Sequence, residues 1–117
     1  MKNNFSITKT IKGKLPSLPF ENMKNEVLGK NYELSLVFIG TKKSQALNKK
    51  YRKKNKPADV LSFPLSKSTG EIFICPKTTK QESIGSLFIH GLMHLKGLRH
   101  GSTMERAEKK VRLKFSI

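Results

Sequence analysis

The sequence predicts an α+β fold: a single domain over residues 1–117, in which a small mixed β-sheet of about four strands packs with helices. Short stretches rich in strand-forming residues are interspersed with stretches whose apolar residues recur at helical spacing, and no internal repeat is present. A chain of 117 residues and 13.3 kDa is long enough for one modest core but too short for two domains.

The first half of the chain predicts a strand, a helix, a second strand and a second helix. These four elements cover residues 5–7, 19–28, 32–39 and 43–52. The first helix has Pro19 at its first position and Gly29 as its stop. The second strand alternates between apolar and polar residues, as a half-buried strand does. The second helix contains Ala46, Leu47 and Tyr51 and leads into a basic loop.

The second half predicts a β-hairpin followed by two helices. The hairpin strands are residues 60–64 and 71–74, and Pro64 indicates an edge strand or a strand end because it cannot donate a ladder hydrogen bond. The next helix has an apolar stripe that predicts its buried face, made of Ile84, Phe88, Gly91, Leu92 and Leu95. The last helix is expected to begin at a capping box over residues 102–105, and its apolar face consists of Met104, Ala107, Val111 and Phe115.

All three histidines of the chain lie in one short segment. His90 and His94 are four residues apart, which places both on one face of a helix. Gly97 is expected to end that helix, since glycine takes positive φ without strain, and the bend lets His100 return toward the pair. Three nitrogen ligands and an open fourth position are typical of a catalytic zinc site. The segment therefore predicts a zincin-like metal helix that binds one Zn²⁺.

Two alternatives to that zinc site stay open from the residues alone. The histidines could be ordinary surface or core histidines that happen to cluster. Nitrogen ligands also accept copper or nickel, so zinc is preferred on geometry and availability.

Gly91, the residue after the first histidine, helps to distinguish between classes of metal enzyme. Metzincin proteases share this spacing of histidine and glycine, but they carry a glutamate general base where this chain has Gly91. Without that carboxylate, peptide hydrolysis has no general base, which typically contributes roughly a hundredfold to ten-thousandfold to the rate. A protease is therefore disfavoured. Phosphodiester cleavage fits better, because a metal with an arginine or lysine can stabilise charge on phosphoryl oxygens.

The charge balance predicts a polyanionic partner. The chain has 24 Lys and Arg against 8 Asp and Glu, for a formal net charge of +16. The densest basic segment is residues 49–56, where Arg52 stands among lysines. Lysine acts on phosphate as a point charge, so contacts to phosphate are expected more than contacts to bases. Seven phenylalanines, two tyrosines and no tryptophan suggest no obvious stacking platform. A compositional bias could explain the lysines, but not the presence of Arg52 among them.

The remaining features concern location and the single cysteine. The N-terminal residues lack the apolar stretch of a signal peptide, and the longest apolar run, residues 34–40, is far shorter than the ~20 residues of a membrane span. A soluble, cytoplasmic protein without a membrane partner is expected. Cys75 cannot form an internal disulfide, and a buried strand position is expected for it, with a metal-ligand role as the alternative.

Four segments, in this order and spacing, resemble the YbeY family of bacterial ribosomal RNA maturation factors. They are residues 47–52, 59–64, 70–76 and 90–100. The resemblance implies a metal-dependent, single-strand-specific endoribonuclease in late small-subunit rRNA maturation and ribosome quality control, in which a zinc-bound water hydrolyses the phosphodiester. Its implied partners are ribosomal RNA and the small ribosomal subunit, and DNA is not expected.

The resemblance also implies roles for individual residues. His90, His94 and His100 match the family's metal ligands, and Arg52 matches an arginine of its basic cleft. Arg52 and His94 are therefore the predicted catalytic residues. A permanently charged, bidentate guanidinium suits a phosphoryl transition state, although a surface arginine in a salt link is the alternative. Asp59, the only aspartate of the chain, either orients a histidine or caps a turn.

The chain departs from the family pattern in three places. Arg99 precedes the last histidine where aspartate is usual, which either weakens metal affinity or adds a phosphate contact. Asn55 and Ala58 stand where aspartate and threonine are more common, and the connection from His100 to the last helix is short. Three other functions therefore stay open: an RNA-binding assembly factor with a structural metal and little nuclease activity, a metalloprotease, and a basic binding module without metal.

Overall fold

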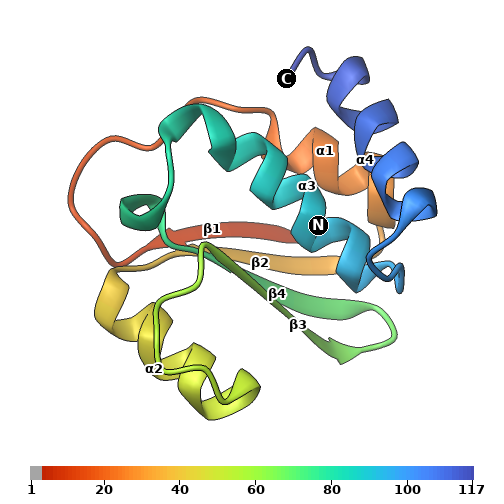
Figure 1. The fold of residues 1–117 in the computed structure, drawn as a ribbon. Helices are drawn as coiled ribbons and strands as arrows, with labels where there is room; N and C mark the ends of the chain where they lie inside the picture. Colours follow the sequence, from red (N-terminus) through yellow and green to blue (C-terminus); the bar gives the residue numbers. More distant parts are fainter. Residues whose placement is uncertain (1–3) are drawn as a thin grey trace.

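The computed structural model describes residues 4–117 and places a four-stranded mixed sheet between helices (Figure 1). The elements in chain order are β1 (Phe5–Lys9), α1 (Phe20–Leu28), β2 (Glu33–Phe38), α2 (Thr41–Arg52), β3 (Val60–Ser66), β4 (Thr69–Ile74), α3 (Ile84–Leu95) and α4 (Ser102–Lys114). The short 3-10 turns η1 (Pro76–Thr78) and η2 (Gln81–Ser83) precede α3. The α+β prediction is confirmed, and the first three residues of the predicted domain 1–117 lie outside the described residues.

The sheet has the strand order β1-β2-β4-β3. Strand β2 pairs in parallel with β1 and β4, whereas β3 and β4 form the predicted antiparallel hairpin. Strand β3 lies at the edge, where Pro64 stands opposite Gly70 of β4 and has no N–H to donate, and the register shifts between Pro64 and Ser66. One side of β3 is therefore unpaired within the described chain, and the candidate site lies along it.

The two faces of the sheet are covered differently. Helices α1, α3 and α4 lie over one face in Figure 1, and α2 lies beneath the other. The core fills the space under α1 and α3, and its strand residues are Phe5, Leu34, Leu36, Phe38, Ile72 and Ile74. The rings of Phe38, Phe20 and Phe88 meet there edge to face, with centroids 5.1 to 6.0 Å apart. Helix α3 packs against α1, α4, β3 and β4, so it occupies the centre of the molecule.

The predicted buried stripe of α3 is confirmed, with one extension. Its predicted residues are buried except Leu95, which is half-buried. Ile89 and Met93 are buried as well, because α4 covers a second side of the helix. Gly91 lets α3 lie close to the sheet, since a β carbon there would stand 3.1 Å from the side chain of Ile72.

The helix predicted at residues 43–52 is confirmed as α2, but its apolar residues are not the ones it buries. Ala46 and Tyr51 are exposed and Leu47 is half-buried, whereas the buried residues of this helix are the polar Ser44 and Asn48. A buried polar group has to be hydrogen-bonded, and both side chains find partners in the basic loop that follows.

Those hydrogen bonds tie α2 to the loop. The Ser44 hydroxyl donates to the Ala58 carbonyl at 2.7 Å and accepts from the Ala58 N–H at 2.8 Å. The Asn48 amide donates to the Lys56 carbonyl at 2.8 Å. The end of α2 that carries Arg52 is therefore fixed by polar contacts, which an apolar pattern does not reveal.

The beginnings of two helices also differ from the prediction. Ser102 is already inside α4 and caps nothing; Gly101 precedes it with φ 148°, a conformation that favours glycine. The Glu105 N–H donates to the Gly101 carbonyl, so the helix begins without the predicted capping box. Pro19 stands one position before α1, and Gly29 ends that helix as expected.

Two further predictions concern burial. Cys75 is fully buried, directly after β4, as predicted. Among residues 4–117, every helix is too short or too polar to cross a membrane.

Candidate metal centre and cleft

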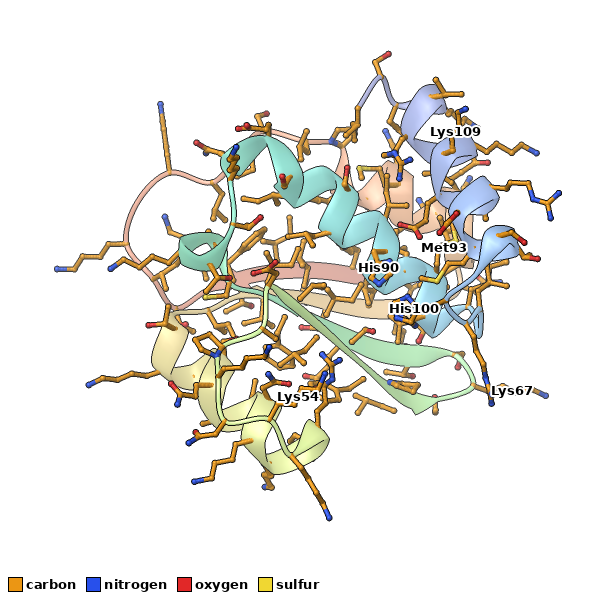
Figure 2. All side chains as sticks on the ribbon, viewed as in Figure 1. Lys54, Lys67, His90, Met93, His100 and Lys109 are labelled. Carbon is orange, nitrogen blue, oxygen red and sulfur yellow. The ribbon has the colours of Figure 1, made fainter. Side chains whose placement is uncertain are left out.

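The three histidines converge at the C-terminal end of α3. His90 and His94 belong to this helix, and His100 comes from the loop after it. Figure 2 shows His90 and His100 close together at this end of the helix. Their ring centroids are 4.6 to 5.1 Å apart. Each ring offers one ligand atom within 4.8 Å of the others, and the two Nε2 atoms of His90 and His94 are 3.1 Å apart.

A glycine turn returns the chain toward the helix. Gly97 has φ 100°, and its N–H donates to the His94 carbonyl at 3.0 Å. The Leu98 N–H donates to the Met93 carbonyl, also at 3.0 Å. These two bonds form a Schellman motif, which satisfies the last carbonyls of α3 and reverses the chain. His100 is therefore held near the pair by local backbone geometry, as the sequence predicted.

The histidine cluster fits a zinc ion. In a tetrahedral site with Zn–N bonds of about 2.0 to 2.1 Å, two ligand nitrogens are about 3.3 Å apart, close to the distance between the His90 and His94 nitrogens. Burial lowers the pKa of His94, and the neighbouring His90 and His100 lower it further, against a backbone hydrogen bond with Leu98 and the charge of Glu108. A neutral imidazole keeps the lone pair that a metal requires.

One cleft joins the histidines to the other predicted catalytic residue. The cleft has a volume of about 560 Å³ and passes over the edge strand β3. Its lining residues are Tyr51, Arg52, Val60, Leu61, Ser62, Phe63, His90, Gly91, His94 and His100. Arg52 is the last residue of α2, on the opposite face of the sheet from α3, so the two sides of the site meet only at this edge.

Comparison with known proteins identifies the family of the chain. The family model described as Endoribonuclease YbeY matches residues 2–114. The chain belongs to the YbeY family. Endoribonuclease YbeY of Rubrobacter xylanophilus is 39% identical over 80 residues, which cover 65% of this chain and 58% of the relative. The protein of the same name from Phytoplasma australiense is 34% identical over 106 residues, which cover 74% and 73% of the two chains.

The matches differ in how much of each relative they cover. The alignments reach 58% to 61% of the length of the first few relatives. The solution structure of TM1509 from Thermotoga maritima has a TM-score of 0.60 at 24% identity, covering 96% of this chain and 91% of that one. That likeness supports the fold.

In this YbeY-family chain, the carboxylate beside the histidines is Glu108, which the sequence reasoning missed. The His90 Nδ1–H points between the two Glu108 oxygens at 3.3 Å from each. That contact leaves His90 Nε2 facing His94, in the carboxylate–histidine arrangement that orients metal ligands. The helical periodicity of the sequence could have indicated this position, because Glu108 follows the buried Met104 by four residues and therefore lies on the inward face of α4.

Asp59 does not contribute to the histidine cluster. It is exposed, and the structure gives it no contact with a histidine. Its backbone carbonyl accepts a hydrogen bond from the Cys75 N–H at 2.9 Å, at the start of the hairpin. Of the two readings open for Asp59, a role in the chain path agrees with the structure.

Arg52 is exposed in the cleft and forms no ion pair with any residue from 4 to 117. The alternative reading, an arginine engaged in a salt link, therefore does not describe this structure. Arg99, the departure from the family pattern, is also exposed but does not line the cleft.

Two aromatic side chains line the cleft, although the sequence suggested no obvious stacking platform. Tyr51 and Phe63 line the cleft with ring centroids 5.1 Å apart, and Phe73 lies 5.8 Å beyond Phe63. These aromatics are spread over α2, β3 and β4, so no local pattern marks them as a group.

Proposed function

We propose that this chain is a metal-dependent, single-strand-specific endoribonuclease that acts in late small-subunit rRNA maturation and ribosome quality control. The observation that carries the proposal is the shared cleft, in which Arg52 and the three histidines meet across strand β3. Membership of the YbeY family supports RNA as the substrate. Ribosomal RNA and the small subunit are the proposed partners, without membrane or DNA, and the cytoplasm is the proposed location.

The proposed metal ligands are His90, His94 and His100. A zinc ion held there supplies a Lewis acid and lowers the pKa of water to give a nucleophile near neutral pH. Glu108 keeps the His90 ring oriented through its hydrogen bond, so the ligand set is arranged before substrate binds.

Arg52 is the proposed phosphate-binding residue. Its guanidinium is unpaired within residues 4–117 and lies in the cleft, so phosphate need not displace an internal carboxylate. A bidentate, permanently charged donor stabilises the charge that develops on the phosphoryl oxygens. The surrounding lysines of residues 49–56 add attraction for the flanking backbone.

A protease is further disfavoured by the packing of α3. Position 91, where a metzincin has its glutamate, lies against the side chain of Ile72, which would have to move for any larger residue. A glutamate general base of the metzincin kind would therefore not fit at position 91 without a shift of Ile72.

A cleavage assay tests the proposal. Single-stranded RNA is incubated with the zinc-loaded parent, Arg52→Ala, His94→Ala and the control Arg106→Ala, which removes an exposed arginine of α4. We expect both cleft variants to lose at least about a hundredfold in rate, while the control is unchanged. Equal rates in all four proteins, with contamination excluded, would show that the nuclease assignment is wrong.

Metal content is measured first, by elemental mass spectrometry on untagged parent and His94→Ala. We expect about one zinc per parent chain and almost none in the variant. An assembly factor with a structural metal would give the same metal result. It would differ in having no cleavage activity and in retaining RNA affinity in His94→Ala despite a lower melting temperature.

A further inference from the structure

We propose that Tyr51, supported by Phe63, is the stacking surface for one unpaired nucleobase of the RNA strand, next to the phosphate that Arg52 binds. The inference rests on the proposed function, because it takes the cleft as the RNA site. It adds a positioning residue and a requirement on the substrate: one base must leave its own stack to occupy the cleft.

The exposure of Tyr51 is the first reason. Among residues 4–117, the large hydrophobic side chains that are exposed are Ile7, Tyr51, Leu65 and Leu113. Only Tyr51 of these four is aromatic and lines the cleft, and 56% of its surface is exposed. Helix α2 is anchored by Ser44 and Asn48 instead, so the fold does not depend on burying this ring.

The second reason is that the Tyr51 ring packs against another aromatic ring. Phe63 lies 5.1 Å from Tyr51, with an interplanar angle of 58°, and Phe73 packs on Phe63 at 5.8 Å. A supported ring with two side-chain torsions loses little conformational entropy when a base stacks on it. Every base has a π face, so such a surface binds bases without reading sequence.

The third reason is the distribution of charge around the ring. Arg52 follows Tyr51 in the chain and lines the same cleft, and the Lys50 ammonium lies 5.2 Å from the Tyr51 ring centroid. One cation over an exposed ring and a second in the same cleft match a nucleotide, whose flat base is flanked by two phosphates. Lys50 is exposed and has a flexible side chain. Its ammonium can therefore leave the Tyr51 ring and contact a phosphate when a base stacks on the ring.

The test separates stacking from charge. Parent, Tyr51→Phe, Tyr51→Leu and the control Leu113→Ala, which removes an exposed leucine of α4, are titrated by fluorescence anisotropy. The ligands are a short labelled single-stranded RNA and an abasic oligomer with the same number of phosphates. A chelator stops cleavage, so binding is read independently of nuclease activity.

We expect the parent, Tyr51→Phe and Leu113→Ala to bind the base-bearing RNA at least about fivefold more tightly than the abasic oligomer. Tyr51→Leu should lose that preference but keep its affinity for the abasic oligomer, since its charge is unchanged. The same preference in Tyr51→Leu as in Tyr51→Phe would overturn the inference.

Tyrosine emission gives a second reading. The chain has no tryptophan, and its other tyrosine, Tyr32, is buried. RNA should quench parent emission and leave the emission of Tyr51→Phe unchanged; equal quenching in both would also overturn the inference. A chain that shows the stacking signals but does not cleave RNA would instead contradict only the proposed nuclease activity.

Discussion

At the scale of single residues, the candidate metal centre depends on a carboxylate from a different helix. Glu108 of α4 accepts the hydrogen bond of His90, and only 13% of the Glu108 side chain is exposed. Arg112, one helical turn further along α4, lies 4.0 Å from the same carboxylate. The histidine is thus oriented by a negative charge that is itself held in place.

We expect Glu108→Gln to weaken zinc affinity about ten- to hundredfold, because the amide keeps the size of the side chain but not its charge. The measurement is competition with a chromophoric chelator. Glu105→Gln, on the exposed side of the same helix, is the matched control and should bind zinc as the parent does. Equal affinity in both variants would contradict the orienting role.

The lowered pKa of His94 predicts how the metal-free protein responds to acid. Burial is the main cause, so the unfolded chain binds the His94 proton more tightly than the folded chain does. The stability associated with neutral His94 is present above the ordinary pKa of 6.5 and is lost as pH falls below that value.

Urea unfolding between pH 7.5 and 5.5, with chelator present, measures this effect. The free energy of unfolding of the parent should fall more over this interval than that of His94→Gln, which cannot take up the proton. Parallel pH profiles for the two proteins would mean that the environment of His94 does not disfavour its charge.

At the scale of elements, the turn after α3 determines where His100 lies. Gly97 has φ 100°, and a β carbon there would meet no atom within 4 Å, so the constraint comes from the backbone and not from crowding. Gly13, between β1 and α1, has a similar φ of 104° and equally open surroundings, but it lies outside the cleft.

We expect Gly97→Ala and Gly13→Ala each to cost about 1 to 2 kcal/mol of stability, because alanine resists positive φ. Only Gly97→Ala should also weaken zinc binding, since of the two turns only that one positions a proposed metal ligand, His100. Thermal melts and zinc titrations on the two variants check this. A similar loss of zinc affinity in Gly13→Ala would show that general destabilisation is responsible.

At the scale of the whole molecule, positive charge is spread around the periphery. Figure 2 shows long side chains that end in nitrogen extending outward around the periphery, among them Lys67 and Lys109. With a formal net charge of +16, the protein attracts RNA over its whole surface, so affinity alone does not locate the substrate.

RNA affinity should therefore fall steeply as salt increases, and Arg52→Ala should make the slope of log affinity against log salt shallower by about 0.7, the value for one phosphate contact on a single strand. Anisotropy titrations over a series of salt concentrations, with chelator present, give the slope. If Arg52→Ala keeps the parent slope, Arg52 does not contact a phosphate in the complex.

Much of the fold could be predicted from the sequence, because periodicity reports which face of an element is buried. The alternation in β2 and the buried stripe of α3 follow that rule, and the edge position of Pro64 follows from its missing N–H. The rule failed for α2, where Ser44 and Asn48 are buried by hydrogen bonds that depend on the path of a later loop.

The histidine cluster is encoded locally, because four residues of helix and one glycine turn bring the three rings together within a single short segment. The net charge can likewise be read from the residues alone. By contrast, no local pattern shows that Arg52 shares the histidine cleft, that Glu108 holds His90, or that Tyr51 packs on Phe63. Each of these contacts joins elements that are separate in the sequence and meet only when the chain has folded around the sheet.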